Sequence, residues 1–181
     1  SVDCAWNPGD HGSAGASISS DGTVVAFDSD ATTLVDDDTN GHPDVFVFDL
    51  AAPPFDAFWV NYGAGYAGTL GIPTLTASAD PVLETSISID ASNSSGGWSV
   101  VALVLGINSA SIPTSAGGTL LVDPLLWFFL GLPPSGTSMQ GDIPRDRALC
   151  GLSVYLQALE LDVGAPRGIS FTPGLQLTFG H

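Results

Sequence analysis

The chain of 181 residues contains no stretch in which apolar residues follow the 3.6-residue period of a helix for more than two turns. Glutamate and lysine, which commonly cover helix surfaces, are nearly absent. Glycine and proline are abundant instead, with 22 and 13 residues, and this composition favours strands joined by turns. We therefore predict an all-β protein.

From about residue 65 onward, strand signals recur at intervals of 8–15 residues. Segments 85–90 and 175–179 alternate apolar and polar residues, as half-buried antiparallel strands do, whereas 100–105 is apolar throughout and indicates a central strand. Eight such segments predict a β-sandwich of jelly-roll or immunoglobulin-like type. They are 72–77, 85–91, 98–105, 119–122, 125–130, 153–161, 168–171 and 175–179.

The first fifty residues differ from the rest, because they hold ten of the 19 acidic residues. Strand signals at 16–19, 23–28 and 44–50 predict a short antiparallel meander. The expected organisation is thus a meander over residues 1–50, a linker over 51–64 and a β-sandwich domain over 65–181.

The run SISSDGTVVAFDSDATTLVDDDTNGHPDVFVFDL, within residues 1–50, resembles one repeat of the TolB-like β-propellers. A propeller needs about four or more blades to close its ring, and no second copy of the repeat follows. A lone blade leaves two strand edges and an apolar face open to water. The resemblance therefore implies a cover, supplied by the C-terminal domain, by another copy of the chain, or by further blades removed by processing.

Residues 65–181 resemble a β domain found at the C-terminal ends of secreted proteins from environmental bacteria. The resemblance lies in GTLGIPTLTASADPVLETSISI, GGTLLVDPLLWFFLGLP and ALCGLSVYLQALELDVGAPRGISFTPGLQLTFG. It implies secretion and a β fold, and no particular chemistry.

The charge balance excludes several classes of function. Against 19 acidic residues stand three Arg and no Lys, which gives a formal net charge of -16. Nothing is present to replace the counterions of a phosphate backbone, so nucleic acid is not an expected partner. The longest apolar run, 120–132, is too short to cross a bilayer. Composition and a first residue Ser1 favour a mature protein secreted to the cell exterior.

A candidate calcium loop lies between the second and third predicted strands. The run from Asp36 to Asp44 fits the first nine positions of an EF-type loop, D-x-D-x-N-G-x-x-D. Its expected ligands are Asp36, Asp38, Asn40, the carbonyl of His42, and Asp44. Position twelve is Val47 and not the usual Glu. The alternative is a turn at Asn40 stabilised by local Asp side chains.

Two further features bear on association. Cys4 and Cys150 are expected to form a disulfide within or between chains, or to remain buried thiols. The 51–64 segment is too aromatic for a solvated tether, and its candidate interface residues dock on the chain's own domain or on a partner subunit. These residues are Phe55, Phe58, Trp59 and Tyr62.

The sequence gives little support for an enzyme. No G-x-S-x-G motif occurs, and the three histidines, His11, His42 and His181, lie in loops or at the terminus. The apolar strands show no isolated acid that would face inward, as a catalytic carboxylate pair would require.

We therefore expect a non-enzymatic structural subunit that assembles with itself into an extracellular filament or surface layer by edge complementation. The alternative is a polysaccharide- or surface-binding module from a larger propeller-containing protein. Either Trp59, Trp98 and Trp127 form a flat sugar-binding platform, or they fill the core of the sandwich and its interfaces. Trp127 lies in the apolar run 125–130 and is expected in the core or a subunit interface, while Trp6 and Trp59 are the better candidates for a contact surface.

Overall fold

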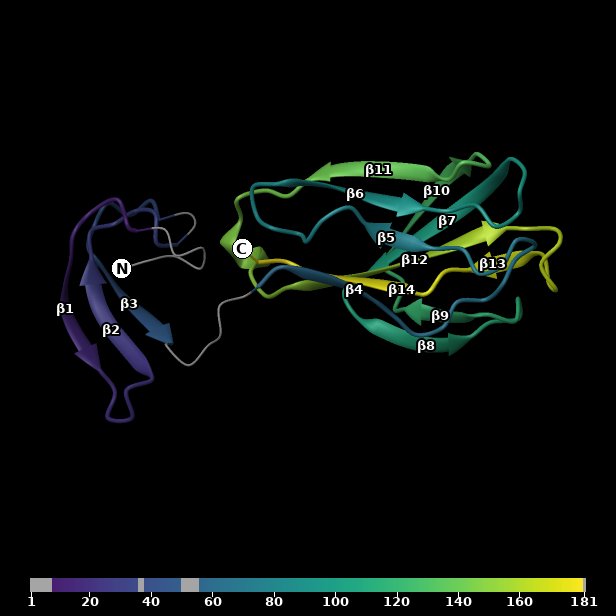
Figure 1. Ribbon diagram of the computed structural model, residues 1–181. Coiled ribbons are helices and arrows are strands. Elements are labelled where there is room, and N and C mark those ends of the chain that lie inside the picture. The colour runs from purple at the N-terminus through teal and green to yellow at the C-terminus, as the bar shows by residue number, and fades with distance from the viewer. Residues whose placement is uncertain (1–7, 36–37, 50–55, 181) are drawn as a thin grey trace.

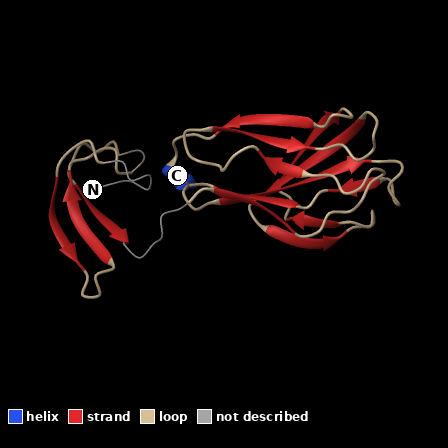
Figure 2. Cartoon of the chain, viewed as in Figure 1, coloured by secondary structure: helices blue, strands red, loops and turns tan. Residues whose placement is uncertain are grey.

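The computed structural model describes residues 8–35, 38–49 and 56–180. Within these ranges the chain folds into antiparallel sheets, and the only helical turn is a 3-10 segment at Arg147–Leu149. No helix in this part of the chain is long and apolar enough to span a membrane. The prediction of an all-β fold is confirmed (Figure 2).

The N-terminal residues form a three-stranded meander, as predicted. Its strands are β1 (Ser13–Ile18), β2 (Val24–Ser29) and β3 (Asp44–Asp49), in the order β1-β2-β3. The β1–β2 turn is closed by Asp21, whose carboxylate accepts hydrogen bonds from Ser19 and Thr23. These bonds lower the pKa of Asp21 to about 2. In Figure 1 the meander lies apart from the other sheets.

A six-stranded sheet forms the centre of the C-terminal domain, with the order β10-β7-β12-β14-β4 and β13 paired with β12. The strand predicted to be central, β7, lies inside this sheet between β10 and β12, which confirms the inference from its uninterrupted apolar sequence. The strands are β4 (Phe58–Tyr62), β7 (Ser99–Gly106), β10 (Leu126–Leu132), β12 (Ser153–Leu161), β13 (Ile169–Phe171) and β14 (Gly174–Thr178).

A second sheet packs on one face of the first. It consists of β5 (Leu75–Ala77), β6 (Ser86–Ala91) and β11 (Thr137–Asp142), in the order β11-β6-β5. The main apolar core lies between the two sheets, and Leu75, Leu103, Leu156 and Leu175 are among its buried residues. This arrangement is a β-sandwich; the choice between jelly-roll and immunoglobulin-like topology stays a prediction.

A hairpin covers part of the opposite face of the six-stranded sheet. Its strands are β8 (Ser109–Pro113) and β9 (Thr119–Val122). Val104, Leu120 and Val122 form a second buried cluster beneath it. Gln157, fully buried on β12, accepts a hydrogen bond from Leu121 N and donates to the carbonyls of Thr119 and Thr172. One amide side chain thus holds the hairpin to the sheet.

The structure differs from the sequence predictions at three strands. Strand β4 lies in the segment expected to be a linker, and it pairs with β14 from Phe58 to Tyr62. Strands β8 and β11 were not predicted, because neither SASIP nor TSMQGD shows a clear apolar alternation. Strand β8 is held in place by pairing with β9, and β11 by pairing with β6, and not by an apolar pattern of their own.

Candidate functional site

Strand β10 is an edge strand whose apolar side chains are exposed. It pairs with β7, and no other described strand lies on its outer side. Leu126, Trp127 and Phe128 are each about half exposed, and Phe129 is 72% exposed. Long apolar edge strands of this kind are sites of strand pairing with other chains. Trp127 had been expected in a core or a subunit interface, and its strand fits the second of these.

The exposed side chains of β10 continue onto neighbouring strands. Phe129 lies opposite Ala102 on β7, and Ala102 lies opposite Leu159 on β12. Val100 and Leu161, on the same two strands, are 41% and 57% exposed. An apolar face therefore extends over three strands beside the β8–β9 hairpin.

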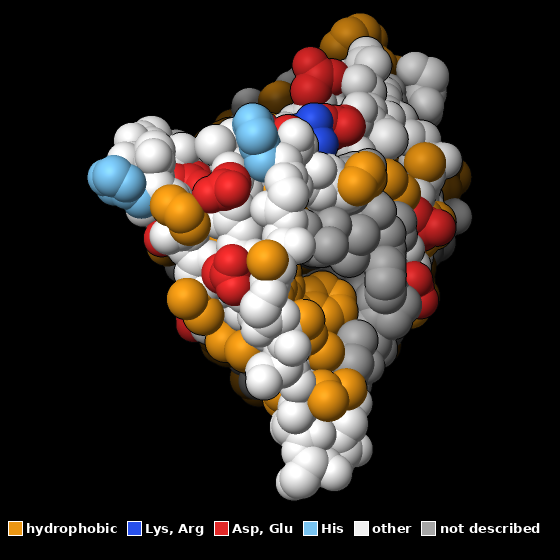
Figure 3. All heavy atoms as spheres, turned by 90° about the vertical axis from the view of Figure 1, so that its left-hand side faces the viewer, with side chains coloured by type: hydrophobic (Ala, Val, Ile, Leu, Met, Phe, Trp, Pro, Cys, Tyr) orange, Lys and Arg blue, Asp and Glu red, His pale blue; other side chains and the backbone are white. Residues whose placement is uncertain are grey.

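The meander is a separate sheet. Among the described residues β1–β3 pair only with one another, so β1 and β3 are the outer strands of this sheet within the described ranges. Val45 and Val47 on β3 are 77% and 70% exposed, while Phe27 and Phe46 stack on the other face with ring centroids 5.6 Å apart. Figure 3, which views the molecule from this side, shows hydrophobic side chains exposed between acidic ones.

The described part of the candidate calcium loop is arranged as a turn. Asn40 Oδ1 accepts a hydrogen bond from His42 N at 2.7 Å, and Asn40 Nδ2 donates to both carboxylate oxygens of Asp44. Asp38 belongs to the described residues, whereas Asp36 lies outside them. No group of three acidic, histidine or cysteine side chains gathers in the described ranges. Asn40 and Asp44 therefore lie together, which is expected both for a calcium loop and for a turn stabilised by local Asp side chains.

The predicted disulfide involves one described cysteine. Cys150 follows the 3-10 turn, packs against the main core and is disulfide-bonded. Cys4 lies outside the described residues. The alternative of a buried free thiol at Cys150 is therefore wrong.

The aromatic residues of the 51–64 segment are used mainly within the chain. Trp59 packs against the main core, and the Tyr62 hydroxyl donates to the Leu121 carbonyl at 2.7 Å. Burial, with the nearby Tyr155, raises the pKa of Tyr62 to about 12. Phe58 is 43% exposed, and Phe55 lies outside the described residues. The segment was expected to dock on the chain's own domain or on a partner subunit, and its strand β4 docks on the chain's own sheet.

The tryptophans do not form one shared platform. Trp59 on β4 and Trp127 on β10 lie on opposite edges of the six-stranded sheet, and Trp6 lies outside the described residues. Trp98 precedes β7 and is 79% exposed. Trp59 packs against the main core, as the second alternative requires, and it does not share one flat surface with Trp127.

Two acids that the sequence analysis missed are buried together. Glu160 at the end of β12 and Asp162 just after it are 2% and 1% exposed. The Ser94 hydroxyl lies 2.7 Å from Glu160 Oε2 and 3.1 Å from Asp162 Oδ2, so its one proton serves one carboxylate at a time. The expectation that no acid faces inward from an apolar strand is wrong for Glu160. The alternation Leu156, Ala158, Glu160 is the signal that places it on the core face.

Backbone and hydroxyl groups satisfy these carboxylates. Ser94 N and Ser95 N donate to Glu160, while Thr69 N, the Thr69 hydroxyl and Gly164 N donate to Asp162. Burial alone would raise the pKa of Asp162, but these hydrogen bonds outweigh it and hold the pKa below its usual value. Because both acids are buried, the cluster ties loops to β12 and offers no reacting group to a substrate.

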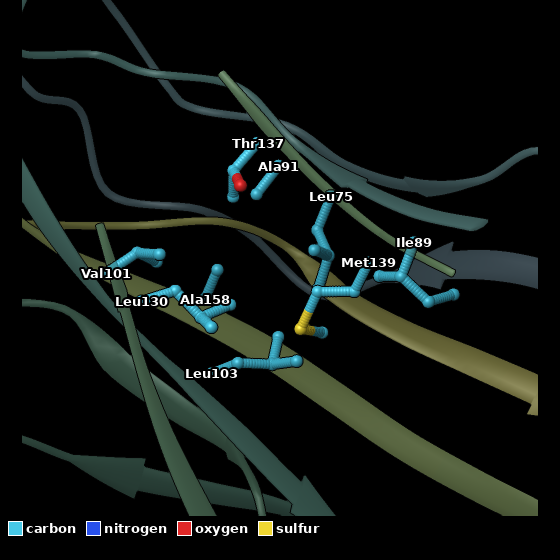
Figure 4. A pocket seen from close by; sticks show the side chains of 9 residues that line it. All are labelled: Leu75, Ile89, Ala91, Val101, Leu103, Leu130, Thr137, Met139 and Ala158. Atoms are coloured by element: carbon cyan, nitrogen blue, oxygen red, sulfur yellow. The ribbon is translucent and has the colours of Figure 1, made fainter. Parts of the chain in front are cut away.

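Two hollows are lined by described residues. The first, seen in Figure 4, lies in the main core among Leu75, Met139 and Leu103, and its volume is about 10 Å³. This is barely the space of one water molecule and is lined by apolar groups, so it is a packing void. The second is an open groove of about 300 Å³ over the outer face of β5, β6 and β11, lined by Thr76, Asp90, Ser138 and neighbouring hydroxyl groups.

Comparison of the chain with protein-family models, curated proteins and solved structures finds no match. The functional interpretation therefore depends on the geometry described above.

Proposed function

We propose that this chain is a non-enzymatic, secreted structural subunit that assembles with copies of itself into an extracellular filament or surface layer. The observation that carries the proposal is that no other described strand covers the outer strands of the meander or strand β10, and that these strands expose apolar side chains. Strand addition at such edges supplies main-chain hydrogen bonds and buries exposed apolar side chains at the same time.

Two separate association surfaces per subunit are what a polymer requires. A single two-fold contact stops at a dimer, while a second contact that does not close a ring continues the chain. In this proposal β1 and β3 are the edges of an incomplete TolB-like blade, which another subunit completes. Calcium at the loop of Asp38, Asn40 and Asp44 would fix the start of β3.

Electron microscopy of the purified protein tests this proposal. Filaments or layers are expected for the wild type, and Val47→Lys should prevent them because a lysine on an edge strand opposes strand addition. Val47 is 70% exposed, so the substitution leaves the fold intact. The matched control is Val163→Lys, at a fully exposed loop position of the other domain. Equal assembly by both variants would overturn the role of the meander.

A second candidate function, polysaccharide binding, is favoured by the open groove. Its lining of Thr, Ser and one carboxylate, Asp90, offers donors and acceptors for sugar hydroxyls. Under this function, binding in a glycan array falls with Asp90→Ala and is unchanged in the Asp123→Ala control. Absence of glycan binding by the wild type would remove this candidate.

A further inference from the structure

Strand β10 is an edge strand without charge. Its seven residues, Leu126–Leu132, carry no charge, and the nearest charged residue before it is Asp123. Two copies of a chain with a net charge of -16 repel each other. An uncharged strand is therefore the part of the surface where a second copy approaches at least electrostatic cost.

We propose that β10 pairs antiparallel with β10 of a second copy around a two-fold axis at Phe129, which joins two six-stranded sheets into one. This inference rests on the proposed function and names one of its two contacts. Phe129 is the middle residue of β10, so an axis there pairs the whole strand. Among the large side chains of the strand it is also the most exposed, at 72%.

In the same register, a large side chain of one copy lies opposite a glycine of the other copy. When Phe129 lies opposite its copy, Trp127 lies opposite Gly131, and both point to the same face of the joined sheet. A Cβ added at Gly131 would meet nothing within 4 Å, so the space above it is open. The indole ring of one copy can therefore lie over the glycine of the other.

The area available indicates a weak contact. The exposed parts of Leu126, Trp127, Phe128 and Phe129 amount to roughly 400 Å² per copy when pairing covers them completely, given about 150–250 Å² for a whole aromatic side chain. The total, about 800 Å², lies below the roughly 1,000 Å² of stable biological interfaces, so we expect the dimer to form only at high protein concentration. Because the copies repel through their net charge, added salt should strengthen the contact.

Cross-linking tests the register directly, since only a residue on a two-fold axis meets its own copy. Under mild oxidation Phe129→Cys should form a disulfide-linked dimer in high yield, whereas Trp98→Cys, equally exposed but outside β10, should not.

Substitution of glycine tests the same contact without cysteine. The Cβ of Gly131→Val meets no heavy atom within 4 Å in the isolated chain, yet in the proposed dimer the valine collides with Trp127 of the other copy, so we expect association to weaken at least about 30-fold. The matched control is Gly141→Val on the edge strand β11, where a Cβ also meets nothing. Sedimentation of both variants and of the wild type measures the effect.

The outcomes separate this inference from the proposed function. Dimers that lose stability only with Gly131→Val, and link only through Phe129→Cys, support the inference even if no polymer forms. Polymers that are equally stable in both glycine variants, without cross-linking at Phe129→Cys, overturn the inference and leave the filament proposal standing. A wild type that is monomeric at every concentration and salt level overturns both.

Discussion

At the scale of single residues, Asp162 links the stability of the C-terminal domain to pH. Its carboxylate accepts hydrogen bonds from Thr69, Ser94 and Gly164, and these hold its pKa below the ordinary value of 3.8. A group whose pKa is lower in the folded state stabilises the fold above its unfolded pKa, and this contribution disappears as the pH falls through the folded pKa.

The stability of the domain should therefore fall as the pH drops below about 4, and Asp162→Asn should lose much of this pH dependence. Urea unfolding at a series of pH values measures it. Comparison with Asp162→Asn is needed because Asp10 and Asp21, in the meander, also have pKa values lowered to about 2. An identical pH profile for the variant and the wild type would contradict the assignment.

Also at the residue scale, Glu160 shows where sequence reasoning fails and why. Its position in the alternation of β12 indicates the core face, but a charged residue is seldom fully buried. What permits its burial is the loop at Ser94 and Ser95, which turns two backbone N–H groups and a hydroxyl toward it. These donors lie more than sixty residues away in the sequence, so no local pattern reveals them.

At the scale of elements, the side chain of Gln157 makes two hydrogen bonds to the β8–β9 hairpin, in addition to the apolar cluster beneath the hairpin and the hydrogen bond from Tyr62. Gln157→Leu removes the acceptor of Leu121 N and the donor to two carbonyls, and should cost about 2–4 kcal/mol. Hydrogen exchange should show the hairpin amides losing protection first. Gln176→Leu, a half-buried position bonded only to two hydroxyls, is the control and should have a smaller effect. Equal effects of the two substitutions would refute this role for Gln157.

The loop before β3 gives the metal prediction. If calcium binds there, it competes with the Asn40 amide for the carboxylate of Asp44, and chelation should lower the melting temperature of the meander. Asp38→Ala should reproduce the effect of chelation, and Asp80→Ala, in the other domain, should not. A melting temperature that changes with neither chelator nor added Ca²⁺ would contradict the metal prediction. The loop would then be a turn stabilised by the side chain of Asn40.

The strands show which parts of the fold were predictable. The boundaries of β9 and β12 follow directly from their apolar patterns, and the meander follows from its repeat-like run. Strand β4 was missed because the prolines before it and Gly63 after it indicated a linker, while its pairing partner, β14, lies over a hundred residues later. For the candidate site, the sequence predicted Trp127 in a core or a subunit interface, but it did not predict that β10 is an edge strand, since the order of strands is a property of the whole fold.

At the scale of the whole molecule, the chain combines a high negative charge with an edge strand, β10, that carries no charge. In the proposed assembly, the net charge opposes contact between copies in dilute solution, and the sheet edges are the surfaces through which the copies associate. Assembly should therefore increase with both protein concentration and salt, in contrast to association driven by ion pairs, which salt weakens.

Sedimentation velocity of the wild-type protein over a range of concentrations and salt levels tests the central claim most directly. Self-association through unpaired edges predicts species that grow from the 18.4 kDa monomer to dimers and larger polymers as concentration and salt rise. A single 18.4 kDa species under every condition would contradict it.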